Sequence, residues 1–312
     1  MTTPDFLKKG DKIAIVATAR KVSPEEIKPS VDLFRSWGLE VVTNENLYAT
    51  DNQFAGNDAL RAASLQQYLD NPEIKAIVCA RGGYGTVRII DRLDFTAFAK
   101  NPKWIVGYSD VTVLHSHINK NLDISTLHAT MPLNIPTDAT AKSYPAVESL
   151  KAALFGNLHG YSGLQLEITP SAHNRSGSCK AEVVGGNLSI LYSLCGSHSD
   201  IDTDGKILFI EDLDEYLYHI DRMMQNLKRT GKLHKIKGLI VGAMSDMHDN
   251  TIPFGKTAEE IVYEAVAEYD YPVLFCQNFG HVGTNNLALP LGVETELVVN
   301  ESCAEMRFEW GK

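Results

Sequence analysis

A serine at position 109 lies where a buried strand is expected to turn directly into a helix. The run Trp104–Tyr108 is strand-like, Gly107 allows a sharp turn, and residues 110–119 have a helical pattern. The first amides of a helix lack intrahelical partners and can donate to an oxyanion beside an exposed hydroxyl. The corner therefore suits a nucleophile, with a simple helix N-cap as the alternative. It lacks the second glycine of the usual G-x-S-x-G elbow.

A glycine-rich loop, Arg81-Gly82-Gly83-Tyr84-Gly85, follows the apolar, strand-like run Ala76–Ala80. Glycines at the end of a strand let backbone amides approach a ligand closely. Their spacing matches neither the dinucleotide fingerprint nor the phosphate loop, which disfavours an NAD-dependent enzyme. The loop is interpreted as an anion or oxyanion nest, with a tight turn at positive φ as the alternative.

A group of acidic residues follows another strand-like run, Lys206–Ile210, and begins with Glu211. A carboxylate at the end of a strand can orient a catalytic histidine, and Glu211 is better placed for this than Glu215, which lies in the expected turn. The alternative is that these acids are solvated and complement the positive end of the next helix.

A histidine in a glycine-flanked loop, His281, follows the strand-like run Val273–Cys276. Such a loop can bring an imidazole to a pocket, where it can act as a general base. His115, His117 and His128 are alternatives nearer to the serine. Two of them, His115 and His117, fall in the expected helix after the serine, on a side that faces away from the corner.

The composition is that of a globular chain and excludes several classes of protein. The 312 residues include 29 Lys and Arg against 39 Asp and Glu, a net charge of −10, and 44% are hydrophobic. An acidic chain without a basic block lacks the charges that bind nucleic acid, and no apolar run reaches the roughly 18–20 residues of a membrane span. The apolar start at residues 13–17 is interpreted as a strand and not a signal sequence, which favours a cytoplasmic protein.

Metal and disulfide chemistry are not expected. The group Asp246-Met-His248-Asp249 lacks a zinc-site spacing such as HExxH, so no metal and no other cofactor is predicted. The five cysteines are an odd number at wide spacing without a CxxC pair, which favours free thiols.

The elements that must position these residues follow an alternating pattern of strands and helices, which predicts a mostly parallel sheet. In such sheets ligands bind outside the carboxyl ends of the strands. In residues 1–135, strands are expected at Lys12–Ala17, Glu40–Thr43, Ala76–Ala80 and Trp104–Tyr108, and helices at Pro24–Trp37, Asp58–Asp70, Thr86–Leu93 and Asp110–Asn119.

The rest of the chain is expected to form a linker region and a second domain. Residues 136–180 are rich in proline and glycine and are predicted to be interdomain, with one helix at about 144–154. Residues 181–312 resume the alternation and end in an antiparallel pair. The expected strands there are Glu182–Val184, Lys206–Ile210, Lys237–Gly242, Val273–Cys276, Glu294–Val299 and Ala304–Glu309, and the helices are Leu188–Cys195, Tyr216–Thr230 and Thr257–Tyr269.

Five motifs in this order resemble the LD-carboxypeptidase family, also called murein tetrapeptide carboxypeptidases. The motifs are RGGYG at 81–85, GYSD at 107–110, GGN at 185–187, LFIEDLDE at 208–215 and GHVGTNNLALPLG at 280–292. The opening strand is also similar, but it departs from the usual Ala-Pro-Ser-type ending, because Thr18-Ala19-Arg20 follows it. That loop is a candidate substrate contact.

The resemblance implies a two-domain α/β fold. The N-terminal domain would have a flavodoxin-like parallel sheet with helices on both faces, and the C-terminal domain would be β-rich α/β, similar to a swivelling barrel. The active site would lie at the domain interface, and the protein would be a homodimer.

The resemblance also implies a Ser–His–Glu triad, carried here by Ser109 as nucleophile, His281 as base and Glu211 as its orienting carboxylate. The backbone amides of Gly83 and Asp110 would form the oxyanion hole. The implied substrate is the muropeptide L-Ala-γ-D-Glu-meso-diaminopimelate-D-Ala, which would lose its terminal D-Ala in cytoplasmic peptidoglycan recycling. The candidates for binding this substrate are Arg81, Gly82, Tyr84 and Arg88, the two arginines for its carboxylate.

Two other functions remain open. The microcin-C immunity peptidases share the triad and fold, and they cleave an aminoacyl–nucleotide linkage. A non-catalytic, two-lobed binding protein for small molecules would also explain the α/β pattern and the glycine loops. It would not explain why a serine, an acid and a histidine all lie at strand ends.

Overall fold

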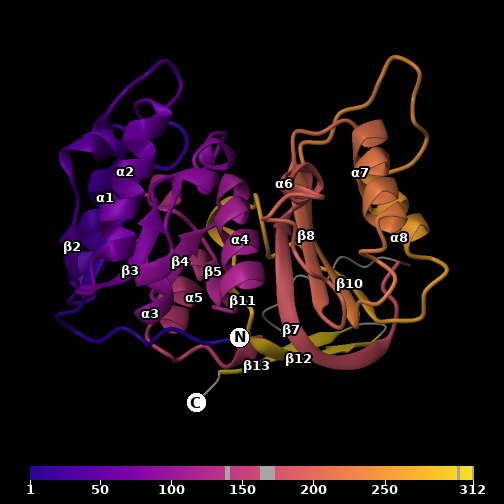
Figure 1. The fold of residues 1–312 in the computed structure, drawn as a ribbon. Helices are drawn as coiled ribbons and strands as arrows, with labels where there is room; N and C mark the ends of the chain where they lie inside the picture. Colours follow the sequence, from indigo (N-terminus) through magenta and orange to yellow (C-terminus); the bar gives the residue numbers. More distant parts are fainter. Residues whose placement is uncertain (138–140, 162–172, 301–302, 311–312) are drawn as a thin grey trace.

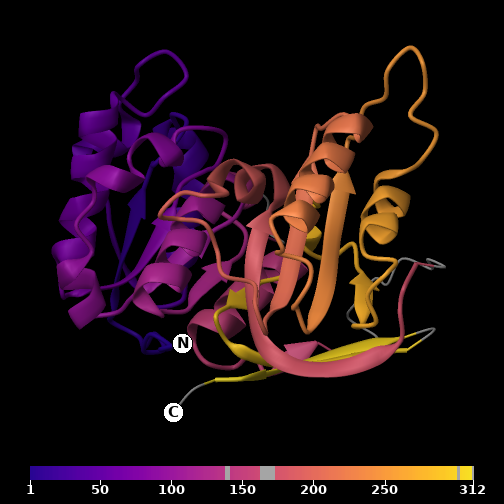
Figure 2. The same ribbon diagram turned by 45° about the vertical axis from the view of Figure 1, so that its right-hand side comes forward.

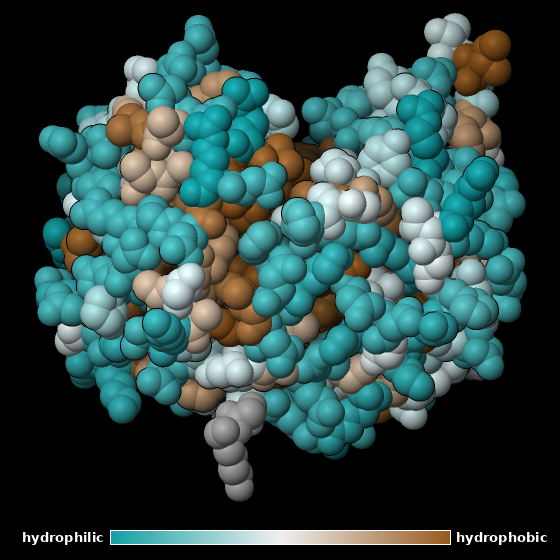
Figure 3. Space-filling view, in the orientation of Figure 1, coloured by the Kyte–Doolittle hydropathy of each residue, from teal (hydrophilic) through white to brown (hydrophobic). Residues whose placement is uncertain are grey.

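The computed structural model describes residues 1–137, 141–161, 173–300 and 303–310. These residues form two sheets that lie side by side, each with its own helices (Figure 1). The space-filling view shows the molecule hollowed between the two halves (Figure 3). No helix of the described residues is long and apolar enough to span a membrane.

The first sheet has the order β11-β5-β4-β3-β1-β2. Its five parallel strands have the flavodoxin-like order 2-1-3-4-5 that the resemblance implied. Short β5 and β11 were not predicted from the sequence. The strands are β1 (Lys12–Val16), β2 (Glu40–Val42), β3 (Ile74–Cys79), β4 (Trp104–Gly107), β5 (Thr126–His128) and antiparallel β11 (Leu289–Leu291).

Helices cover both faces of this sheet, as expected. The apolar side chains of α1 and α5 belong to one core cluster, and those of α2, α3 and α4 belong to another. Ser23 begins α1 with a capping box, and Asn57 caps α2. The helices are α1 (Pro24–Ser36), α2 (Asp58–Asp70), α3 (Thr96–Lys100), α4 (Thr112–Leu122) and α5 (Pro145–Leu154).

The helix predicted over Thr86–Leu93 is wrong. The chain forms two short 3-10 turns there, Thr86–Arg88 and Ile90–Arg92. The run is rich in β-branched residues, which lose side-chain freedom in a helix.

The second sheet has the order β10-β9-β8-β7-β12-β13-β6. Strand β7 is much longer than the short strand predicted there, because its first half pairs with β12 and its second half with β8; Figure 2 shows how it bends between them. The predicted terminal antiparallel pair is confirmed as β12 and β13. The strands are β6 (Gly160–Tyr161), β7 (Gly177–Asn187), β8 (Ile207–Leu213), β9 (Gly238–Ser245), β10 (Val273–Phe275), β12 (Glu294–Val299) and β13 (Ala304–Glu309).

Three helices pack on one face of the second sheet and share its core cluster. They are α6 (Leu188–Leu194), α7 (Leu217–Arg229) and α8 (Ala258–Ala265). Each of these helices was predicted from the sequence, with ends that differ by at most four residues.

The two halves are joined by a strand that crosses from one to the other as well as by packing. Strand β11 comes late in the sequence but extends the first sheet, where it pairs with β5. The predicted helix of the linker region is present as α5, which packs on the first half. Part of that region, residues 162–172, lies outside the described residues. The division at 135 and 181 stays a prediction.

Candidate active site

Ser109 occupies a strained corner between β4 and α4. Its φ is +63°, in the left-handed region that serine rarely adopts, and the φ of Gly107 is +156°. Such strain costs about 1–3 kcal/mol and is concentrated at functional sites. The alternative, that Ser109 is a simple helix cap, is wrong. Tyr108 is the cap residue of the 3-10 turn Ser109–Val111, and no side chain accepts a capping hydrogen bond there.

The glycine loop lies directly against this serine. A Cβ added at Gly82 would be 2.9 Å from both Cβ and Oγ of Ser109, so only glycine fits there. Gly83 and Gly85 have positive φ, so the loop is also the tight turn that was the alternative interpretation of these glycines. No acceptor among the described residues takes the amide hydrogen of Gly83 or of Asp110. Both predicted oxyanion donors are therefore free to bind a ligand.

A buried arginine that the sequence analysis did not single out holds this loop in place. Arg61 is 1% exposed, and its Nη1 donates to the carbonyl oxygens of Thr18 (2.6 Å) and Gly85 (2.9 Å). The carboxylate of Asp110 accepts a hydrogen bond from the amide of Thr86 (2.9 Å). These bonds tie the glycine loop to the segment after β1 and to the serine corner, a long-range arrangement that no local sequence signal reveals.

Glu211 and His281 form a hydrogen-bonded pair, as the sequence interpretation expected. The distance between Glu211 Oε2 and His281 Nδ1 is 2.7 Å, and Glu211 is fully buried. A register shift in β8 at Glu211 interrupts the ladder there. Gly280 lies against the carboxylate, where a Cβ would be 2.5 Å from Oε2. Glu215 instead lies 2.6 Å from His219.

The surroundings of His281 favour its protonated form. Burial alone would lower the pKa of His281, but the Glu211 carboxylate, with a smaller contribution from Asp212, raises the pKa above its ordinary value. The ring of Tyr108 packs on the imidazole, with 4.8 Å between centroids, and Ser245 Oγ donates to the carbonyl oxygen of His281. These contacts fix the orientation of the ring.

The alternative histidines have other places in the fold. His115 Nε2 donates a hydrogen bond to the carbonyl oxygen of Gly107 (2.9 Å), and burial lowers the pKa of His115 to about 4. His117 pairs with Ser199 Oγ. His128 is fully buried, and burial lowers its pKa. None of the three lines the cavity described next.

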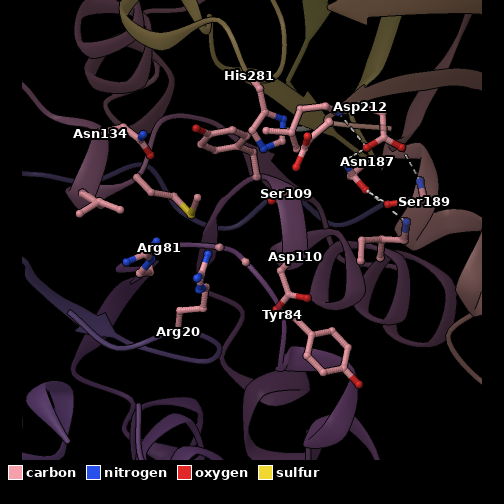
Figure 4. Close-up of a pocket in the computed structure, with 18 of the residues that line it drawn as sticks. Arg20, Arg81, Tyr84, Ser109, Asp110, Asn134, Asn187, Ser189, Asp212 and His281 are labelled. Carbon is pink, nitrogen blue, oxygen red and sulfur yellow. Dashed lines mark hydrogen bonds between the residues drawn. The ribbon is translucent and has the colours of Figure 1, made fainter. Parts of the chain in front are cut away.

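A cavity of about 530 Å³ lies between the two halves and brings the candidate residues together. Ser109 faces it from the first half, and His281 faces it from the second (Figure 4). No hydrogen bond joins these two side chains within the described residues, and such bonds often form only when substrate is bound. Arg81, Gly82 and Tyr84 also line the cavity.

Arg88 is placed differently from the other substrate-binding candidates. It does not line the cavity, and its guanidinium donates to both carboxylate oxygens of Asp58. Arg20 lines the cavity instead. This arginine lies in the loop 18–20, which departs from the family pattern and was expected to be a candidate substrate contact.

The GGN motif at 185–187 connects the two halves beside the cavity. The amide of Asn187 donates to Thr112 Oγ1 (3.0 Å), and a Cβ at Gly186 would be 2.5 Å from the same oxygen. Asn187 Nδ2 donates to buried Asp212 (2.9 Å), which follows Glu211 directly. Burial, and then the charge of Glu211, raise the pKa of Asp212 to about 7. The motif thus links the helix after the serine to the strand that carries the acid.

Within the described residues, no group of three or more His, Cys, Asp or Glu could hold a metal ion. His248, part of the group weighed as a metal site, lies 2.5 Å from Asp214. No disulfide joins the five cysteines, all of which lie within the described residues.

Two family models and several known proteins are similar to this chain. Residues 13–129 match the model of the LD-carboxypeptidase N-terminal domain, and residues 180–297 match that of the LD-carboxypeptidase C-terminal domain. The chain is 33% identical to the probable murein peptide carboxypeptidase of Bacillus subtilis, covering 96% of this chain and 93% of the relative. It is 24% identical to the murein tetrapeptide carboxypeptidase of Pseudomonas aeruginosa, covering 90% and 91%.

Solved structures show the same fold. The muramoyltetrapeptide carboxypeptidase of Oxalobacter formigenes superposes with a TM-score of 0.84 at 25% identity, over 96% of this chain and 100% of that one. The protein MccF in complex with glutamyl sulfamoyl guanosine also superposes with a TM-score of 0.84, at 21% identity and over 99% of both chains. At that identity the second likeness concerns the fold alone.

Proposed function

Since the chain belongs to the LD-carboxypeptidase family, we propose that it is a serine peptidase that removes the terminal D-Ala from the murein tetrapeptide L-Ala-γ-D-Glu-meso-diaminopimelate-D-Ala. One observation supports this most strongly: His281, which is hydrogen-bonded to buried Glu211, lines the same cavity as strained Ser109. Cytoplasmic peptidoglycan recycling is the setting that fits this reaction. A homodimer stays a prediction.

In the proposed reaction Ser109 Oγ attacks the carbonyl carbon of the diaminopimelate residue, and His281 accepts the hydroxyl proton. Because Glu211 accepts a hydrogen bond at Nδ1, it keeps the proton there and leaves Nε2 as the base. The amides of Gly83 and Asp110 stabilise the oxyanion.

The intermediate then breaks the peptide bond. His281 delivers its proton to the nitrogen of the leaving D-Ala, and an acyl-enzyme on Ser109 remains. Water, deprotonated by the same imidazole, hydrolyses this ester and restores the serine.

A second candidate function is cleavage of an aminoacyl–nucleotide linkage by the same triad. The structural likeness to MccF, whose solved complex contains glutamyl sulfamoyl guanosine, is the observation that favours it. A third, a non-catalytic binding protein, predicts no covalent chemistry at Ser109.

One experiment separates the three functions. The purified protein is incubated with the tetrapeptide, with an aminoacyl nucleotide, and with a fluorophosphonate that labels activated serines. The proposal expects D-Ala release and labelling at Ser109. Cleavage of only the nucleotide substrate would select the second function, and a folded protein that neither cleaves nor labels would select the binding protein.

A further inference from the structure

Two arginines on one wall of the cavity have no carboxylate partner. Arg20 and Arg81 both line the cavity, and neither forms an ion pair with any described carboxylate. Arg81 Nη1 donates weakly to the carbonyl oxygen of Lys21 (3.3 Å), but its Nε is buried without a partner. A buried guanidinium nitrogen without an acceptor costs free energy, so a ligand oxygen is the expected partner.

The two guanidinium groups are close enough to affect each other. Burial, and then the charge of Arg20, lower the pKa of Arg81 from its ordinary value. Figure 4 shows both side chains on the same side of the pocket. Like charges held together without an anion between them are typical of a site that binds one.

This basic wall adjoins the proposed oxyanion hole. A Cβ at Gly83 would be 2.2 Å from Cδ of Arg20, so the arginine side chain lies on that glycine. The neighbouring Gly82 contacts Ser109. An anion held by the arginines is therefore next to the carbonyl group that the serine would attack, as the carboxylate of the residue beyond the scissile bond must be.

The opposite wall has the opposite charge. Asp212, Asp214 and Glu215 line the cavity from the second half, and no Lys or Arg among the described residues pairs with them. Asp212 lies across the pocket from the arginines in Figure 4. The cavity thus repels an anionic group at one wall and attracts it at the other, which orients a bound peptide.

We propose that Arg20 and Arg81 together bind the free carboxylate of the terminal residue that the enzyme removes. This inference rests on the proposed function, and it makes Arg20 a specificity-determining residue. A phosphate group offers the same oxygen chemistry, so the test must distinguish the two sources. Arg20 lies where the opening strand departs from the ending that is usual in the family.

The test compares the tetrapeptide with its C-terminal amide, which differs only in the loss of the carboxylate charge. Wild type is expected to prefer the acid by about 100-fold or more in kcat/KM. Arg20→Gln and Arg81→Gln should each lower kcat/KM for the acid by about 10–100-fold, the usual effect of losing a charged hydrogen bond, and leave the amide nearly unaffected. Arg35→Gln, an equal charge change on the exposed face of α1, is the control and should change neither value.

Two results would overturn the proposal. One is an equal loss for acid and amide in the arginine variants, because a merely structural role would give that pattern. The other is a preference of wild type for an aminoacyl nucleotide that disappears in Arg20→Gln, since the anion would then be a phosphate. An unchanged midpoint of urea denaturation confirms that each variant is folded.

A folded, labelled wild type that cleaves neither peptide would contradict the proposed function instead. The arginine pair is then tested by competition, with D-alanyl-D-alanine and its amide as competitors of fluorophosphonate labelling. Protection by the acid alone, weakened at least tenfold in Arg20→Gln, supports the carboxylate site. Equal protection by acid and amide, or none by either, overturns it.

Discussion

Ser109 has a backbone conformation that strains a serine, and it lines a cavity together with His281, which is hydrogen-bonded to buried Glu211. These three residues were proposed as a triad from the family resemblance, and the structure places two of them at one cavity with the third behind the histidine. For Arg20 the sequence indicated only that its loop is a candidate substrate contact. Arg61 and the Thr112 contact could not be predicted, because each depends on segments far apart in the chain.

Replacing Glu211 by Gln should lower kcat by about 10²–10⁴-fold, because an amide no longer holds the imidazole in the required tautomer. The carboxylate also raises the pKa of His281, and the base must be neutral to accept a proton. In wild type, kcat/KM should therefore rise with pH through a midpoint above the ordinary histidine value. In Glu211→Gln this midpoint should move to lower pH.

The pH profile of kcat/KM for D-Ala release measures both effects. Glu215→Gln is the matched control, because that carboxylate pairs with His219 and not with His281. The midpoint at which kcat/KM rises with pH should shift much less in Glu215→Gln than in Glu211→Gln. A profile of Glu211→Gln that keeps the wild-type midpoint would contradict the role of this carboxylate.

At the scale of elements, the glycine loop and the serine corner must fit each other closely. Gly82→Ala places a methyl group 2.9 Å from Ser109 Oγ, a distance that Cβ atoms do not tolerate. We expect fluorophosphonate labelling of Ser109 to slow by about 10-fold or more, since a small misplacement of a reacting group is costly. Intact-protein mass spectrometry follows the labelling.

Gly205→Ala serves as the control for this substitution. It lies in an open turn where an added Cβ meets nothing within 4 Å, and its φ is +72°. We expect the substitution to lower the free energy of unfolding by about 1 kcal/mol and to leave the rate of fluorophosphonate labelling of Ser109 unchanged. If Gly82→Ala were labelled as fast as wild type, the loop would not be shaping the serine corner.

The elements themselves were predictable where they are long and regular. Helices α1, α2 and α7, of 13 residues each, were predicted, whereas β5 and β11 have three residues each and give no periodic signal. The helix predicted at residues 86–93 is wrong, and that run is rich in β-branched residues, which disfavour a helix.

At the scale of the whole molecule, catalysis in this account depends on how the two halves dock. The serine belongs to the first sheet and the Glu211–His281 pair to the second, and the Asn187–Thr112 hydrogen bond joins them beside the cavity. The sequence predicted two halves with the site between them. It could not predict that β11 crosses back to extend the first sheet.

Thr112→Val should weaken this docking, because it leaves the buried amide of Asn187 without an acceptor. We expect a loss of about 1–3 kcal/mol in the free energy of unfolding, measured by urea denaturation, and a lower kcat. Thr112→Ser keeps the hydroxyl and should recover most of the kcat. Equal activity of the valine and serine variants would show that the hydroxyl does not position the halves.

The central claim, that Ser109 is the nucleophile of a carboxypeptidase, is tested most directly by measuring D-Ala release from the murein tetrapeptide by wild type and by Ser109→Ala. The account predicts release by wild type and a loss of roughly 10³-fold or more in the variant, as for other triad nucleophiles. Release that survives the substitution would contradict the assignment of the triad.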